Sequence, residues 1–152
     1  MKINVGLTKL LEWIIVVSML VILLSNFVNV ILRYFFSAPF YWTDELSALL
    51  FVWIIFIGSA VAVATNSHAS LDYFFRKMTP QFKKITKIVY TIIIIVTLLY
   101  LTIGSYNWIE VLSDQKYSSL PLPLALGFLP IPIGCALMIY FLIVNLIKDF
   151  KK

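Results

Sequence analysis

The sequence predicts an all-α integral membrane protein with four transmembrane helices, on three observations. Hydrophobic residues make up 62% of the 152 residues and the mean hydropathy is +0.99, which leaves too little polar surface to cover a water-facing globule. Charged residues make up only 12%, about half of the usual share of a soluble domain. Four apolar stretches are long enough to cross a hydrocarbon core of about 30 Å. We place these spans at about 10–34, 44–64, 86–109 and 130–150 of a single membrane domain, 1–152.

The first span carries a stripe of polar side chains that leads to a single basic residue. At about 3.6 residues per turn these side chains lie within about 100° of each other on a helical wheel. They are Ser18, Ser25, Asn26, Asn29 and Arg33. Because a polar stripe in lipid requires a protein partner, we expect it to contact either the other helices of the chain or a second subunit.

A hairpin follows the first span, and it is where charge first interrupts the apolar sequence. Its aromatic density is typical of a membrane interface, with Tyr34, Phe35, Phe36, Phe40, Tyr41 and Trp42 within nine residues. Pro39 marks the turn, because the residue before a proline disfavours the helical conformation. We expect Thr43 to cap the second helix and Asp44 and Glu45 to occupy its first turn, where the helix dipole favours acids.

The second span and the segment after it contain features that predict packing and membrane anchoring. Gly58 and Ala62 form a small-xxx-small pattern that favours close approach of another helix. A short amphipathic surface helix is predicted at about 69–79. His68 and Asp72 are interpreted as structural residues of this loop. The basic residues Arg76, Lys77, Lys83, Lys84 and Lys87 indicate contact with anionic lipid headgroups rather than with nucleic acid.

The last part of the chain is uncharged and interrupted by prolines. Pro121, Pro123, Pro130 and Pro132 precede or begin the fourth apolar run. Because proline is tolerated in the first turn of a helix but not inside it, we expect an irregular or short helical segment at 120–129 before the fourth span.

Basic residues predict the orientation of the chain. Four spans place both termini and the loop after the second span on one side of the membrane. That side holds ten lysines and arginines, and the opposite side holds only Arg33 and Lys116. The positive-inside rule therefore predicts cytoplasmic termini, with the first hairpin on the outer side.

The sequence lacks the residue sets that catalysis requires. Cys135 and His68 are each the only residue of their type, so neither a disulfide, a cysteine metal cluster nor a pair of histidine ligands is possible within one chain. No paired carboxylates occur in a span and no glycine-rich phosphate loop is present. We therefore predict a non-enzymatic membrane protein without a cofactor, metal site or nucleic-acid partner.

The order of several motifs resembles the small membrane subunit (Q subunit) of TRAP (tripartite ATP-independent periplasmic) transporters, the DctQ-like family. The motif N-V-x-L-R-Y-x-F, here Asn29 to Phe36, is followed by Pro39, Trp42 and Glu45. Further similar positions are Phe51, Trp53, Gly58, His68, Asp72, Leu129, Pro130 and Pro132. The resemblance covers nearly the whole chain.

The resemblance implies a sodium-driven importer of an organic acid in the bacterial inner membrane. It implies two protein partners, a large multi-span membrane subunit (M subunit) that moves the solute and a periplasmic substrate-binding protein (P subunit). The small subunit would brace the scaffold of the large one and help to dock the binding protein. We interpret Asn26, Asn29, Arg33, Trp42, Asp44 and Glu45 as a subunit interface or a structural charge cluster. The alternative is a self-assembling membrane protein, such as a holin-like pore or a scaffold.

Overall fold

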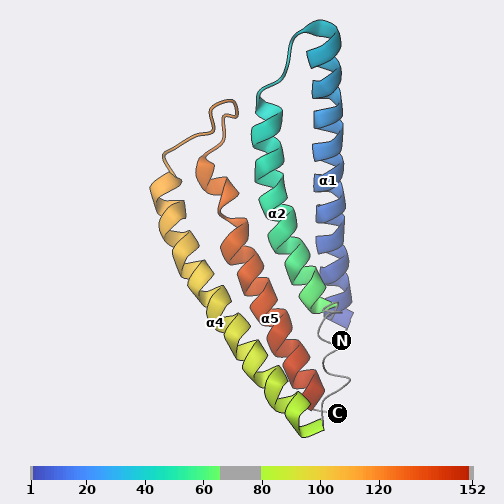
Figure 1. Cartoon of the computed structure of the whole chain (residues 1–152), viewed down its shortest axis with the longest axis vertical. Coiled ribbons are helices and arrows are strands. Elements are labelled where there is room, and N and C mark those ends of the chain that lie inside the picture. The colour runs from blue at the N-terminus through green and yellow to red at the C-terminus, as the bar shows by residue number, and fades with distance from the viewer. Residues whose placement is uncertain (1, 66–79, 151–152) are drawn as a thin grey trace.

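The computed structural model describes residues 2–65 and 80–150, and the described part is all-helical apart from its connections. The elements are α1 (Lys2–Phe36), α2 (Trp42–Ala64), α4 (Pro80–Leu112), the 3-10 helix η1 (Leu124–Gly127) and α5 (Pro130–Phe150) (Figure 1). Each long helix contains a stretch apolar and long enough to cross a membrane: Gly6–Phe36, Trp42–Ala64, Ile88–Leu112 and Leu124–Ile147, the last beginning in η1. The four predicted spans therefore correspond to four membrane-spanning stretches.

The helix boundaries follow from local sequence. Helices α4 and α5 both begin at a proline, Pro80 and Pro130, whose missing N–H is not needed in a first turn. The irregular segment expected at 120–129 contains η1, and α5 begins directly after it. Helix α1 ends at Phe36 because Ser37 adopts a left-handed conformation with φ of 53°. The predicted amphipathic helix at 69–79 lies outside the described residues.

The four long helices lie in one layer, in the order α1, α2, α5, α4 (Figure 1). The extensive helix–helix contacts join α1 to α2, α2 to α5 and α5 to α4. The start of α1 and the end of α5 lie at the same end of the layer, which we call the terminal end. The opposite end, called the turn end, holds the α1–α2 connection at residues 37–41 and the α4–α5 loop at residues 113–123.

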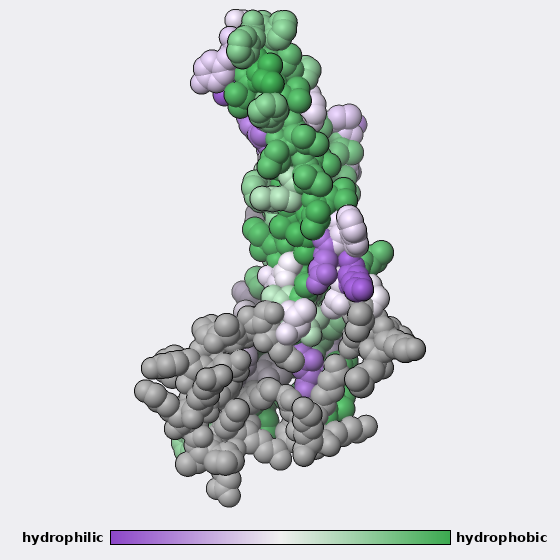
Figure 2. Space-filling model, turned by 90° about the vertical axis from the view of Figure 1, so that its right-hand side faces the viewer, coloured by the Kyte–Doolittle hydropathy of each residue, from purple (hydrophilic) through white to green (hydrophobic). Residues whose placement is uncertain are grey.

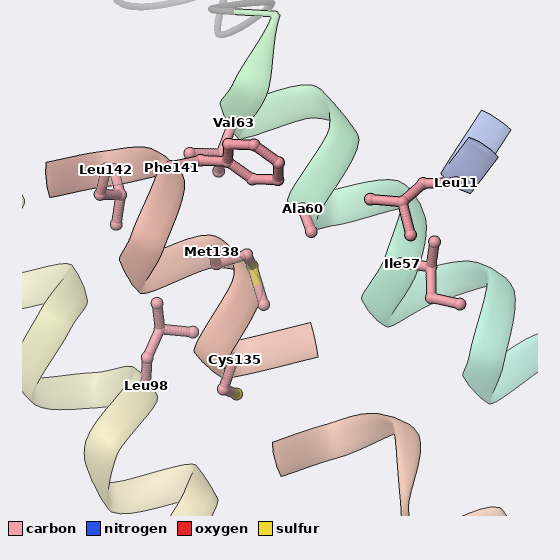
Figure 3. Close-up of a cluster of buried hydrophobic side chains, with 9 residues drawn as sticks. All are labelled: Leu11, Ile57, Ala60, Val63, Leu98, Cys135, Met138, Phe141 and Leu142. Atoms are coloured by element: carbon pink, nitrogen blue, oxygen red, sulfur yellow. The ribbon is translucent and has the colours of Figure 1, made fainter. Parts of the chain in front are cut away.

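The hydrophobic core lies between the central helices α2 and α5, towards the terminal end. Figure 3 shows Phe141 of α5 beside Val63 and Ala60 of α2, and Phe141 is only 1% exposed. The members of this core cluster are Leu11, Ile57, Ala60, Val63, Leu98, Cys135, Met138, Phe141 and Leu142. Because α2 and α5 supply most of them, the two helices form the rigid centre of the layer.

Glycine permits the closest approach between α2 and α5. A Cβ atom added to Gly134 of α5 would lie 2.6 Å from Cβ and 3.0 Å from the backbone oxygen of Phe56. The predicted packing glycine, Gly58, is less crowded, since a Cβ there would lie 3.8 Å from Cδ1 of Ile15, an ordinary contact distance. The tightest glycine-mediated helix contact in the described part of the chain is thus at Gly134, which the sequence pattern missed.

A single layer leaves much apolar surface uncovered. The helix at one edge, α1, is exposed over most of its circumference, and Figure 2 shows hydrophobic residues over most of the coloured upper part of this side of the molecule. Large side chains such as Trp13 (69% exposed) and Phe27 (62% exposed) are not covered by any helix of residues 2–65 and 80–150. In a membrane this surface is covered by lipid or by another protein.

Candidate functional site

The turn end holds the six residues interpreted as a subunit interface or charge cluster, and Asn29 of α1 joins the first two helices there. Its side-chain Nδ2 donates to Thr43 Oγ1 at 2.6 Å, and its Oδ1 accepts from the Phe40 backbone N–H at 2.7 Å. Thr43 Oγ1 in turn donates to the Phe40 carbonyl at 2.8 Å. Asn29 is 4% exposed and Thr43 is fully buried. This closed network fixes the connection at 37–41 against α1.

A second polar contact lies one helical turn below the first. Asn26 Nδ2 donates to Ser47 Oγ at 2.7 Å and to the Ile22 carbonyl at 2.8 Å, while Ser47 Oγ donates to the Thr43 carbonyl. Two members of the polar stripe are therefore satisfied by α2 of the same chain. Ser25 Oγ instead donates to the Ile22 carbonyl of its own helix.

The predicted helix cap at Thr43 is wrong. Helix α2 begins at Trp42, its N-cap residue is Tyr41, and no side chain forms the cap hydrogen bond. Thr43 lies inside the first turn and its hydroxyl is committed to Asn29 and Phe40. Because these two hydrogen bonds occupy the hydroxyl, it does not cap the helix. Trp42 is half-buried and stacks on Phe40, with ring centroids 5.7 Å apart.

Glu45 anchors the α4–α5 loop to α2. Its Oε1 accepts from the Ser118 N–H at 2.9 Å, and its Oε2 accepts from the N–H groups of Ser119 and Leu120 at 2.9 and 3.0 Å. One half-buried carboxylate therefore satisfies three consecutive backbone donors of a loop more than 70 positions away in the sequence. Such charge-assisted bonds are roughly twice as strong as neutral ones.

The anchored loop has a defined internal structure. Tyr117 N–H donates to the Leu122 carbonyl at 3.0 Å and Leu124 N–H donates to the Gln115 carbonyl at 2.8 Å, which form a short antiparallel bridge. The hydroxyl of Tyr117 lies over Gly127, where an added Cβ would be 2.7 Å from it. Burial raises the pKa of Tyr117 above its ordinary value of 10.0, and the nearby Glu45 carboxylate raises the pKa further.

Arg33 and Asp44 differ from Glu45 in having exposed side chains. Arg33 lies in the last turn of α1 and Asp44 in the first turn of α2. Within residues 2–65 and 80–150 no ion pair joins Arg33 to Asp44 or to Glu45. The hairpin is therefore held by Asn29 rather than by an arginine–carboxylate pair.

The other candidate residues are distributed elsewhere. Gly58 and Ala62 lie on α2 and are half-buried. The loop and headgroup roles predicted for segment 66–79 stay predictions, because this segment lies outside the described residues; it contains His68, Asp72, Arg76 and Lys77. Lys83, Lys84 and Lys87 lie on the first turns of α4, at the terminal end. Among the described residues no group of three or more His, Cys, Asp or Glu side chains could hold a metal ion.

Two interhelical contacts were not anticipated from the sequence. Trp53 Nε1 of α2 donates to the Leu126 carbonyl of η1 at 3.2 Å, and Asn145 Nδ2 of α5 donates to the Val63 carbonyl of α2 at 2.8 Å. A tryptophan or asparagine within an apolar run signals that a polar partner exists. The residue type alone does not show that the partner is a backbone carbonyl of another helix. These two contacts could therefore not be predicted from the sequence.

Comparison with known proteins identifies the protein family of this chain. The family model described as "Tripartite ATP-independent periplasmic transporters, DctQ component" matches residues 22–152. The chain belongs to the DctQ family. It is therefore a multi-pass inner-membrane protein of a transporter family that works with a large permease, and its family is not a catalytic one.

Three relatives place this DctQ chain among transporter permeases. A Haemophilus influenzae protein assigned as a TRAP transporter small permease is 24% identical over 152 residues, covering 100% of this chain and 92% of the relative. The C4-dicarboxylate TRAP transporter small permease protein DctQ of Vibrio cholerae is 26% identical over 122 residues, 78% of this chain and 53% of the relative. The sialic acid TRAP transporter permease protein SiaT of H. influenzae is 30% identical over 83 residues, 53% of this chain and 13% of that much longer protein.

Proposed function

We propose that this chain is the small membrane subunit of a TRAP transporter and that it braces the scaffold of the large permease. The observation that carries the proposal is the single layer of helices, in which the two edge helices α1 and α4 leave broad apolar surfaces uncovered. A substrate carrier that moves within the membrane requires a neighbour that does not move. A wide, rigid layer centred on α2 and α5 is suited to this role because its core does not depend on the partner.

The solute and its driving force belong to the same proposal. The relatives are named for C4-dicarboxylate and sialic acid transport, both of which are carboxylated solutes. We therefore propose uptake of an organic acid driven by a sodium gradient. The pockets between α1 and α2, beside η1 and between α4 and α5 have mainly apolar linings, which suit a carboxylated solute poorly. The large permease and the binding protein would therefore provide recognition, and this chain would provide support.

The orientation and the third partner follow from charge. In the sequence, ten basic residues lie near the two termini and at 76–87, against two, Arg33 and Lys116, in the connections of the opposite side, and this asymmetry supports cytoplasmic termini. The turn end would then face the periplasm, and the α4–α5 loop anchored by Glu45 would be available to a periplasmic substrate-binding protein. Single-cysteine labelling tests this orientation: a cysteine at Ser118 is expected to react with a membrane-impermeant maleimide in intact spheroplasts, and one at Lys9 only after lysis.

The functional test is solute uptake in cells. Deleting this chain while the neighbouring permease and binding protein are retained is expected to abolish sodium-dependent uptake of radiolabelled dicarboxylates or sialic acid. Expression of the chain in trans should restore it. Unchanged uptake after deletion would contradict the proposal. Leakage of vesicles that contain the purified chain alone would instead support the holin-like pore.

A further inference from the structure

A groove runs along the α1–α2 boundary on the half of the layer nearest the turn end. It has a volume of about 560 Å³ and is lined by bulky apolar side chains, with the bonded pair Asn26–Ser47 in its floor. Met19, Leu23 and Phe27 line the α1 side and are 50%, 58% and 62% exposed. The α2 side is formed by Phe51, which is 45% exposed.

The dimensions of the groove match one leaflet of a bilayer. Its α1 wall extends from Met19 to Val30, which at ~1.5 Å per residue is about 16 Å. Half of a hydrocarbon core of ~30 Å is about 15 Å. The groove therefore has the length of an acyl chain that starts at the headgroup level and ends at the bilayer centre.

Two opposite charges lie beyond the turn end of this groove. Arg33 is one turn past Val30 and two turns past Asn26, so it continues the α1 wall. Asp44 is one turn before Ser47 and two turns before Phe51, so it continues the α2 wall. Both are exposed, and no ion pair joins them within the described part of the chain.

Helix geometry brings these charges towards one level. The Asn29–Thr43 bond sets the register, so the Cα of Arg33 lies roughly five residues, or ~7.5 Å, beyond that of Asp44 along the helix axes. Side chains lean towards the N-terminus of their own helix, so Arg33 leans back towards the groove and Asp44 leans away from it. A guanidinium and a carboxylate thus flank the mouth of the groove without neutralising each other.

We propose that this groove binds a zwitterionic phospholipid that carries a primary ammonium, of the phosphatidylethanolamine class. One acyl chain lies between Met19 and Phe51, the phosphate accepts from the Arg33 guanidinium, and the ammonium donates to the Asp44 carboxylate. Guanidinium groups are well suited to phosphate, and a primary ammonium provides donors that a quaternary choline lacks. This assigns Arg33 and Asp44 to lipid rather than to the large permease, and it does not depend on the proposed transport function.

The lining favours lipid over a helix of the partner. Tight helix–helix contacts in membranes use small residues that let two backbones approach, as Gly134 does between α5 and α2. The groove is lined instead mainly by large side chains, Met19, Ile22, Leu23 and Phe27 on α1 and Phe51 on α2, which keep another helix backbone at a distance. The unpaired charges at its mouth would be costly to bury against an apolar helix.

Native mass spectrometry of the full chain, released from nanodiscs of stated composition, tests the proposal. In nanodiscs of phosphatidylethanolamine, phosphatidylcholine and phosphatidylglycerol in equal parts, we expect phosphatidylethanolamine to be the lipid retained by the wild-type chain. Arg33→Ala and Asp44→Ala should each lower its retention about fivefold, the effect of one interfacial charge. The matched controls Asp114→Ala and Lys116→Ala, at exposed loop charges of the same end, should leave retention unchanged.

A variant that fills the groove tests the acyl-chain site without changing any charge. Val30→Trp places an indole in the groove at a position that is 52% exposed, and it should also displace the lipid. The proposal is overturned if all variants retain phosphatidylethanolamine equally, or if phosphatidylcholine or phosphatidylglycerol is retained equally well. It is also overturned if a photo-crosslinker at Phe27 captures a protein rather than lipid in cells.

Discussion

Removing the Glu45 carboxylate should release the α4–α5 loop while leaving the helices in place. In Glu45→Ala the N–H groups of Ser118, Ser119 and Leu120 lose their acceptor. Ser118 and Ser119 are exposed and can bond to water, but Leu120 is half-buried. We therefore expect the loss of about one charge-assisted hydrogen bond in net free energy, roughly 1.5–3 kcal/mol for opening of the loop.

That free energy predicts a measurable change in hydrogen exchange. At 1.4 kcal/mol per factor of ten, amide exchange at residues 118–120 should become about 10- to 150-fold faster in Glu45→Ala. Asp44→Ala is the matched control, because it removes the neighbouring acid, which does not accept from this loop. Exchange rates within twofold of the wild-type protein at residues 118–120 would refute the anchoring role of Glu45.

Three further predictions test the packing around this anchor. Asn29→Ala leaves the part-buried Phe40 N–H without its acceptor and removes the buried bond to Thr43, which should cost about 1–3 kcal/mol. We expect faster proteolysis of the α1–α2 turn and a lower unfolding temperature in detergent, and unchanged proteolysis would argue against the network. Gly134→Ala should lower the unfolding temperature, because the added Cβ would meet the backbone of Phe56. The control Gly104→Ala, with open space around the added Cβ, should leave it unchanged. Equal unfolding temperatures for the two variants would refute the close approach at Gly134. The raised pKa of Tyr117 predicts that its packing in the loop is retained at neutral pH and lost as the pH rises through that pKa. Glu45→Ala should lower the pKa of Tyr117 in an ultraviolet titration. An unchanged pKa would contradict the proximity of the two groups.

The number and type of the long elements could be predicted from sequence because they depend on local properties. Apolar length alone indicates a spanning helix, and α5 begins at Pro130, the residue at which the sequence places the start of the fourth span. Helix α4 begins at Pro80, whereas the sequence places the start of the third span at about 86. The order of the helices in space could not be predicted, since every span is apolar on most sides and lipid competes with protein for each face. Gly134, rather than Gly58, allows the tightest approach, and only the three-dimensional register distinguishes them.

The candidate site was predictable as a region but not in its contacts. The hairpin and its acids stood out because charge is rare in this sequence, yet Asp44 and Glu45 are adjacent and look alike. Glu45 points to a loop more than 70 residues away, while Asp44 is exposed beside the groove. The sequence allowed Asn29 to contact either a partner subunit or another helix of the same chain. Its hydrogen bond to Thr43 shows that the contact is within the chain.

The most direct test of the account is the mass of the complex that forms around this chain in its native membrane. We expect affinity purification of the full chain, followed by native mass spectrometry, to yield one copy bound to one large permease of many spans. Substitutions that place bulky polar side chains on the apolar surface of α4 should prevent the permease from co-purifying. The small chain itself should keep its fold. Recovery of a homo-oligomer of this chain, without a permease at stoichiometric amounts, would contradict the central claim.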